Sequence, residues 1–231
     1  MKIKRERNPK ILNHFKLSIN GLEVKDKSFI KNAKILQFPN YKQLHLENMD
    51  FIEDNEVDDI NEFFMHSSPY SLKQMYLHGS LDNWPKIDRF VLGMDNLFGS
   101  LTEVAFFHSF QISQKHLATI IEGCRYVNRL VIYWWKWVID QDFALDPKLE
   151  YRIELLDLFR TWNTSDNECI TEKWLAHLII AMGKTNLSRT LRYFHVREKD
   201  FKGIIAQNLF DKHRFRVRVK GDDDYPMLRD Y

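Results

Sequence analysis

The hexapeptide VNRLVI, Val127 to Ile132, contains the pattern that decides the fold of this chain of 231 residues. Apolar side chains stand at its first, fourth and sixth positions, which is typical of a short β-strand with one buried face. The same form recurs in Tyr41–Leu46, Leu72–Leu77, Leu101–Phe106 and Ile153–Leu158. A form that returns along one chain predicts a repeat architecture.

The interval between these segments is nearly constant. Their fourth residues are numbers 44, 75, 104, 130 and 156, so the steps are 31, 29, 26 and 26 residues. Two weaker copies follow, in which Leu191 and Phe215 are taken as the fourth residues. An interval of about 28 residues has room for one strand and one helix.

Helical patterns fill most of the intervals. In 113–123 and 171–183, a Ser or Thr N-cap precedes an apolar face at helical spacing, and a glycine ends the segment. Further helices are predicted at 58–65, 85–98 and 199–210. No helical stripe is present in residues 139–152, so one repeat is expected to lack its helix.

A strand followed by a helix about every 28 residues resembles the leucine-rich repeat family, in particular the longer repeats of ribonuclease-inhibitor and F-box-associated proteins. The resemblance covers residues 35–220. It implies an α/β solenoid with a parallel sheet on the concave side and helices on the convex side. The family usually has Asn or Cys at the ninth position of each repeat. This chain departs from that rule, which predicts an irregular arc, because its residues there are Met49, Ser80, Ser109, Trp135 and Thr161.

The two ends of the chain fit no repeat. Within residues 1–34, a basic start is followed by Phe15–Val24, where apolar and polar residues alternate on both sides of Asn20-Gly21. Asn-Gly between two such runs predicts a β-hairpin, which is expected to cap the first repeat. Residues 221–231 are expected to form an acidic C-terminal tail.

Composition narrows the classes of function. The chain has 34 basic and 32 acidic residues, so its net field would attract nucleic acid only weakly. The two cysteines, Cys124 and Cys169, form no CxxC pair, which argues against a disulfide framework and a zinc site. No secretory signal and no run of about 18 apolar residues is present, so we expect an intracellular, cytoplasmic protein without membrane insertion.

Two segments resemble catalytic motifs, but neither has the residue spacing that the motif requires. Gly183-Lys184-Thr185 resembles the end of a phosphate-binding loop, but Leu178 stands where that loop needs a glycine. Cys124 and Arg129 are separated by four residues, one fewer than in a phosphatase loop, so Cys124 is predicted to lie in the core. Three polar residues are expected to be solvated and not to form a metal or pH-sensitive site: His45, Glu47 and His78. We therefore expect no enzyme activity, no cofactor and no metal.

The concave face offers a candidate site. The third, fifth and seventh residues of each repeat point away from the helices, because side chains alternate along a strand. The seventh position becomes aromatic halfway along the chain, and such a row is typical of a protein-binding surface. The predicted partner-binding residues are Tyr76, His78, Phe107, Tyr133, Trp134 and Phe159.

The aromatic cluster Tyr133–Trp137 has more than one interpretation. Leu130 and Ile132 before it belong to the core, and Trp135 and Trp137 are expected to fill the turn after the strand. The cluster itself can be core, a docking surface for a protein, or a stacking platform for single-stranded nucleic acid, although few basic residues lie near it.

The resulting hypothesis for function is a noncatalytic module or scaffold subunit that binds another protein or a multiprotein complex. One alternative is an α/β enzyme or nucleotide-binding domain without a recognisable motif. The other alternative is a nucleic-acid adaptor that uses the basic residues of both ends, namely Lys2, Lys4, Arg5, Arg7 and the strand Arg214–Lys220.

Overall fold

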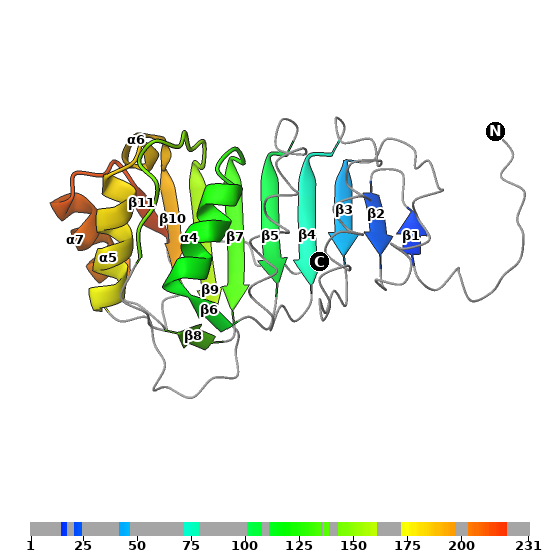
Figure 1. Cartoon of the computed structure of the whole chain (residues 1–231), viewed down its shortest axis with the longest axis horizontal. Helices are drawn as coiled ribbons and strands as arrows, with labels where there is room; N and C mark the ends of the chain where they lie inside the picture. Colours follow the sequence, from blue (N-terminus) through cyan, green and yellow to red (C-terminus); the bar gives the residue numbers. More distant parts are fainter. Residues whose placement is uncertain are drawn as a thin grey trace, which may run out of the picture.

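The computed structural model describes residues 15–17, 21–24, 42–46, 72–78, 101–107, 111–134, 136–138, 143–160, 172–196 and 203–220. These residues form a nine-stranded sheet in which the strands lie side by side in sequence order (Figure 1). The strands are β1 (Phe15–Leu17), β2 (Gly21–Val24), β3 (Gln43–Leu46), β4 (Gln74–His78), β5 (Glu103–Phe107), β7 (Arg129–Trp134), β9 (Leu155–Arg160), β10 (Tyr193–Val196) and β11 (Arg218–Lys220).

The directions of the strands confirm the predicted solenoid. β1 and β2 are antiparallel, and they form the hairpin expected at the N-terminal end. Each later strand pairs in parallel with the one before it, from β2 and β3 to β10 and β11. Parallel strands need a crossover connection, and strands added in sequence order by right-handed crossovers place the connections on one side, which is the geometry of a solenoid.

One backbone contact sets the register of the repeats. The carbonyl of Lys42 accepts the N–H groups of both Lys73, at 2.8 Å, and Gln74, at 3.0 Å. Equivalent paired contacts recur at the carbonyls of the second residues of the following repeats, Lys73, Thr102, Asn128 and Glu154. This repeated contact keeps the third residues of all these repeats level across the sheet.

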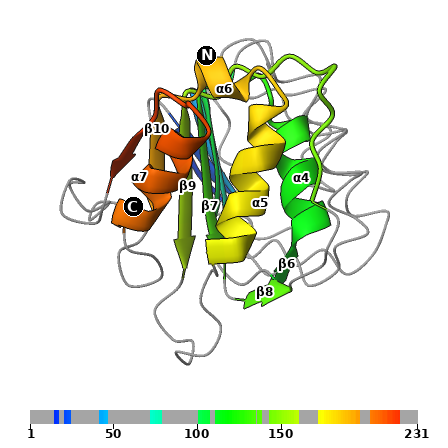
Figure 2. The same ribbon diagram turned by 90° about the vertical axis from the view of Figure 1, so that its left-hand side faces the viewer.

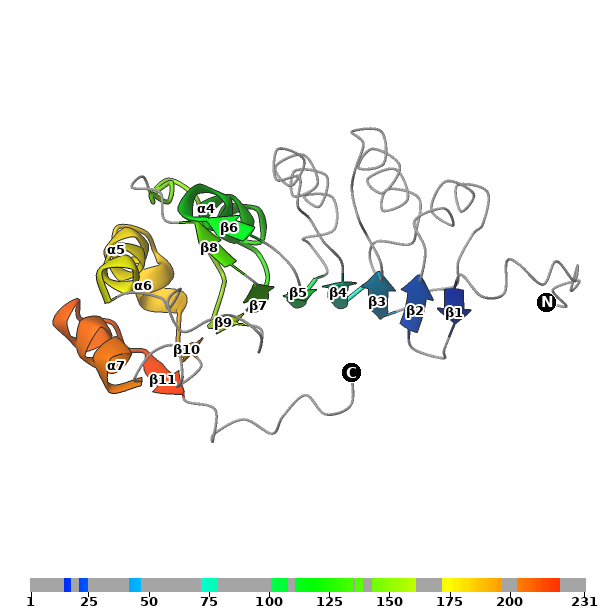
Figure 3. The ribbon, with the colours of Figure 1, turned by 90° about the horizontal axis from the view of Figure 1, so that it is seen from below.

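The described helices lie on one face of the sheet, which is the convex face (Figure 3). They are α4 (Gln114–Gly123), α5 (Glu172–Gly183), α6 (Leu187–Thr190) and α7 (Gly203–Lys212). The predicted helices at 113–123 and 171–183 are thus confirmed, and the one predicted at 199–210 begins later, at Gly203. The predictions at 58–65 and 85–98 lie outside the described residues.

The core lies between the helices and the sheet. The fourth and sixth residues of the strands fill it, among them Leu130 and Ile132, and both are fully buried as predicted. Cys124 is also fully buried in this core, which confirms the apolar role predicted for it. Burial of a continuous apolar layer of this kind is the main stabilising contribution in a repeat protein.

The connection between β7 and β9 departs from the regular repeat. Residues 143–150 contain no helix, in agreement with the sequence. They form a loop beside α4 and α5, with a turn at Pro147 and Lys148 (Figure 2). Trp137 does not simply fill a turn as expected, because it lies in β8 (Lys136–Val138), which pairs in parallel with β6 (Gln111–Ser113). A second, two-stranded sheet therefore stands beside the main one.

The last two repeats have a different register from the one expected. Phe194 pairs with Leu156, so Phe194 and not Leu191 is the fourth residue of its repeat, and the step is 194 − 156 = 38 residues. Val219 pairs with Phe194 and takes the place expected of Phe215. The extra helix α6 adds to the length of this repeat. It begins where the Thr185 hydroxyl accepts the N–H of Leu187 at 3.1 Å.

No helix among the described residues is both long enough and apolar enough to span a bilayer.

Candidate functional site

The concave face of the sheet is built from two rows of side chains, each with one residue from every strand of the main sheet from β3 to β11. The first row, at the third position, consists of Gln43, Gln74, Glu103, Arg129, Leu155, Tyr193 and Arg218. The second row, at the fifth position, consists of His45, Tyr76, Ala105, Val131, Asp157, His195 and Lys220. Neighbouring members stand about 4.8 Å apart, so side chains in one row can touch.

Side chains from six strands are joined across this face into a continuous chain of polar contacts, here called the polar ladder: Gln43, Gln74, Glu103, Arg129, Asp157 and His195. At the N-terminal end, the Gln43 amide donates to Gln74 Oε1 at 2.6 Å. The Gln74 amide donates in turn to Glu103 Oε2 at 3.1 Å. A side-chain amide has both a donor and an acceptor, so Gln74 can accept from one neighbouring strand and donate to the other.

Arg129 is the centre of the polar ladder. Its Nη1 donates to Glu103 Oε1 at 3.2 Å, and its Nε and Nη2 both donate to Asp157 Oδ2, at 3.2 and 3.0 Å. On the far side of Asp157, His195 Nδ1 lies 3.7 Å from Oδ1. The planar guanidinium suits this position, because it presents donors to two carboxylates at once.

The contacts of Asp157 and His195 in the polar ladder affect stability because both side chains are buried. The Asp157 side chain is completely buried, and His195 is nearly so. A carboxylate removed from water needs compensating contacts, since an uncompensated buried charge costs several kcal/mol, on the order of 3–5. Arg129 supplies two of those contacts, so it compensates in part for the burial of the Asp157 side chain.

A ring cluster lies beside the polar ladder and differs from the expected exposed surface. The Tyr76 ring stacks on His45 with centroids 4.6 Å apart, and it lies 6.1 Å from the Phe107 ring. Tyr76 and Phe107 pack with Ala105 and Val131 and are only 1% and 7% exposed. The expected exposure of these two rings is therefore wrong, because side chains on adjacent strands shield one another. Their part in partner binding stays a prediction.

The other four predicted partner-binding residues occupy the expected strands. His78 is level with Phe107, Tyr133 is level with Phe159, and Trp134 follows Tyr133 at the end of β7. The structure thus pairs two parts of the seventh-position column, His78 with Phe107 and Tyr133 with Phe159, and the rest of the column stays a prediction. The orientation of the side chains of His78, Tyr133, Trp134 and Phe159 lies outside the described residues.

The C-terminal end of the concave face is open. Tyr193 keeps 37% of its surface exposed and is level with Arg218, which is also exposed. Arg216 is exposed, whereas Val217 between it and Arg218 is buried in the core, so both arginines lie on the side away from the helices. Apolar ring surface and positive charge therefore occur together where the polar ladder ends.

Sequence reasoning missed Tyr193 as a site residue because of the register of its repeat. With Leu191 taken as the fourth residue, Tyr193 became the sixth and was assigned to the core. The structure makes Tyr193 a third residue, level with Leu155. The available signal was the alternation of YFHV, in which Phe194 is the apolar residue that fits the core.

No metal site is evident: within the described ranges, no three His, Cys, Asp or Glu side chains are grouped so that they could hold an ion.

The fold is an α/β solenoid that resembles leucine-rich-repeat proteins. No protein-family model matches the chain, and no curated protein matches it in sequence. Among solved structures, it is similar to a chain of the crystal structure of the Rad7 and Elc1 complex in yeast, with a TM-score of 0.53 and 18% identity. The match covers 91% of this chain and 51% of that chain, so it spans about half of that protein. At an identity this low, the match shows a similar fold and does not transfer a function.

Proposed function

We propose that this chain is a noncatalytic interaction module, a scaffold subunit that binds another protein on the C-terminal end of its concave face. The observation that carries the proposal is the exposed ring of Tyr193 beside Arg218. Tyrosine and arginine are enriched among the residues that contribute most to binding at protein interfaces. The similar chain in the Rad7 and Elc1 complex supports the proposal, because it is part of an assembly of two proteins.

The two ends of the third-position row differ in what they can offer a partner. Gln43, Gln74, Glu103 and Arg129 satisfy one another through the polar ladder, so a partner would have to break existing contacts to bind them. The Tyr193 ring, which is 37% exposed, offers a partner apolar surface to cover. The anchor for a partner is therefore Tyr193, and the aromatic column of Tyr133 and Phe159 is a predicted extension of the same surface.

Burial argues against a catalytic role for Asp157 and His195, an acid and a base that lie side by side among the described residues. A catalytic group must lie within hydrogen-bond reach of its substrate. Asp157 and His195 are 0% and 1% exposed, and the Asp157 carboxylate is engaged by Arg129. This pair fits a structural role better than a role in proton transfer.

The nucleic-acid alternative rests on a specific observation and has a separate signature. Arg214, Arg216 and Arg218 are all exposed at the end of the solenoid, and Tyr193 next to them could stack on a base. Binding through phosphate contacts weakens steeply as salt is added. A protein partner held mainly by the Tyr193 ring would keep most of its affinity when salt rises from 50 to roughly 200 mM.

Site-specific photocrosslinking tests the proposal. A benzophenone side chain is introduced at position 193 and, as the matched control, at Asn208, which is exposed on α7. After irradiation in an extract of the native cells, we expect a discrete protein adduct at 193 that is absent at 208. Equal adducts at both positions, no adduct at 193, or an adduct that nuclease treatment removes would contradict the proposed function.

A further inference from the structure

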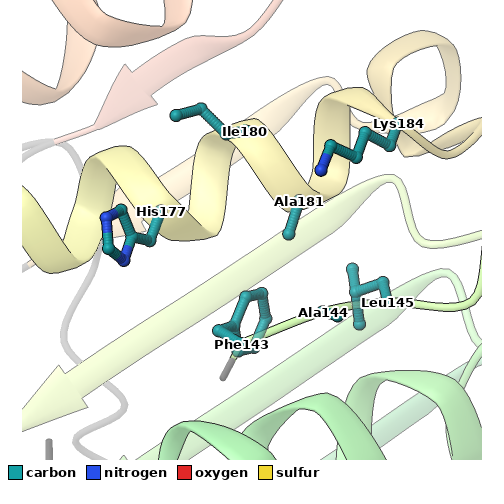
Figure 4. Close-up of a pocket in the computed structure, with 7 residues that line it drawn as sticks. All are labelled: Phe143, Ala144, Leu145, His177, Ile180, Ala181 and Lys184. Atoms are coloured by element: carbon teal, nitrogen blue, oxygen red, sulfur yellow. The ribbon is translucent and has the colours of Figure 1, made fainter. Parts of the chain in front are cut away.

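We propose a second docking site, on the convex face, where a hollow beside α5 accepts one apolar side chain from an acidic segment of a protein partner. The hollow is separate from the concave face, and the inference does not depend on the function proposed above. Its lining residues are Phe143, Ala144, Leu145, His177, Ile180, Ala181 and Lys184 (Figure 4).

The hollow exists because one repeat lacks its helix. A helix with its side chains is about 10–12 Å wide, whereas an extended chain is much thinner. Residues 143–146 run next to α5 without a helix, so Phe143 and Leu145 form one wall of the hollow and Ala181 on α5 faces them (Figure 4). The sequence feature behind the site is therefore the missing apolar stripe in 139–152.

Polar contacts hold the loop after the lining residues in place. The N–H of Asp146 donates to Glu122 Oε1 on α4 at 2.7 Å, and the Tyr151 hydroxyl donates to the Asp146 carbonyl at 3.1 Å. Asn186 accepts the N–H of Tyr151 at 2.9 Å and donates to its carbonyl at 2.8 Å. These contacts hold the chain from Asp146 onwards, directly after the buried lining residue Leu145, so this wall of the hollow is formed before a partner arrives, which lowers the entropy lost on binding.

The size of the hollow indicates what it can hold. Its volume is about 130 Å³. Pockets for cofactors and drug-sized ligands measure about 300–1,000 Å³, whereas an apolar cavity of roughly 150 Å³ holds a single benzene ring. The hollow therefore fits one leucine, methionine or phenylalanine side chain, in the manner of an interface anchor pocket.

Charge defines the chemistry of the partner. Lys184 and His177 are exposed at the hollow, and Lys173 is exposed one turn before His177 on the same helix. Within the part of the chain that the structure describes, no acidic residue lines the hollow and no ion pair involves the Lys184 ammonium. Asp146, next to Leu145, directs its Oδ1 to the N–H of Lys148. An apolar residue flanked by carboxylates is the complementary sequence.

The test uses peptide display on the full chain, followed by affinity measurement of the selected peptide by fluorescence polarisation. Two variants alter the hollow, Ile180→Ser and Lys184→Glu. Two matched variants on α7 change the same residue types at exposed positions, Ile204→Ser and Lys212→Glu. Circular dichroism of each variant verifies that the fold is kept.

We expect selection of peptides in which an apolar residue stands beside two or more Asp or Glu residues. Their affinity should fall by about tenfold or more in Ile180→Ser and Lys184→Glu, and stay within about twofold in the α7 variants. Tyr193→Ala should leave this binding unchanged, which separates the hollow from the concave face. Failure to select acidic peptides, equal losses in the α7 variants, or loss in Tyr193→Ala would overturn the proposal.

Discussion

Arg129→Met tests the energetic role of the polar ladder. Methionine keeps much of the length and apolar volume of the arginine side chain but removes its charge and donors. The substitution eliminates the contacts of 3.0 and 3.2 Å to Asp157 and the contact of 3.2 Å to Glu103. Because Asp157 is completely buried, water cannot replace the lost donors without a rearrangement of the sheet.

The size of the effect follows from the burial of the two partners. The side chains of Arg129 and Asp157 are 23% and 0% exposed. Removing one member of a buried ion pair costs about 3–5 kcal/mol of unfolding free energy. For a domain of 150–250 residues, each kcal/mol lowers the melting temperature by about 2–4 °C, so we expect a decrease of roughly 6–20 °C.

The assay is urea denaturation and thermal melting, both followed by circular dichroism. Arg192→Met is the matched control, because Arg192 forms an ion pair with Glu154 at 3.9 Å in which the side chains are 68% and 43% exposed. An exposed pair contributes about 0–1 kcal/mol, so the control should melt within a few degrees of wild type. A loss below about 1 kcal/mol in Arg129→Met, or equal losses in both variants, would refute the reasoning.

Two further predictions concern buried groups. Burial raises the pKa of the Tyr151 hydroxyl above its usual value of 10.0, and the carboxylates of Glu122 and Asp146 raise it further. Above pH 10 the unfolded chain loses a proton that the folded chain keeps, so the free energy of unfolding should fall with rising pH, by up to about 1.4 kcal/mol per unit. Tyr151→Phe should lack this part of the slope, and an unchanged slope in denaturation at pH 9–11 would contradict the shift. For the core, the Cys124 thiol in a Cys169→Ser background should react with a thiol reagent only on unfolding, because Cys124 is fully buried. Fast labelling of the folded protein would show that the helix-to-sheet layer is open there.

Sequence alone was sufficient for the architecture because the fold is repetitive. The spacing of apolar residues in segments such as Val127–Ile132 places β7 beside its neighbours, and the capped segment 113–123 places α4 over them. Each repeat adds the same information, so an irregular segment such as 143–150 does not obscure the others. The register predicted from the sequence is wrong in the repeat of 38 residues that contains α6. A helix of only four residues carries almost no periodic signal.

The site was less predictable, because alternation assigns a residue to a face but does not show what it contacts there. Tyr76 and Phe107 are on the concave side as expected, yet each is shielded by neighbours that only the register brings together. The polar ladder likewise joins Arg129 to Asp157 across 28 residues of sequence. Its members are in two different rows, because Leu155 occupies the third position of β9, so reading one row at a time could not reveal the pairing.

The central claim is that a protein partner binds the concave face at Tyr193. The most direct measurement is calorimetric titration of the crosslinked partner, once purified, with the wild-type chain, Tyr193→Ala and the convex-face control Ile204→Ala, whose target is 73% exposed. The account predicts that Tyr193→Ala weakens binding by about tenfold or more, as expected for a central aromatic anchor, while Ile204→Ala binds like wild type. Equal affinity of all three proteins would contradict it.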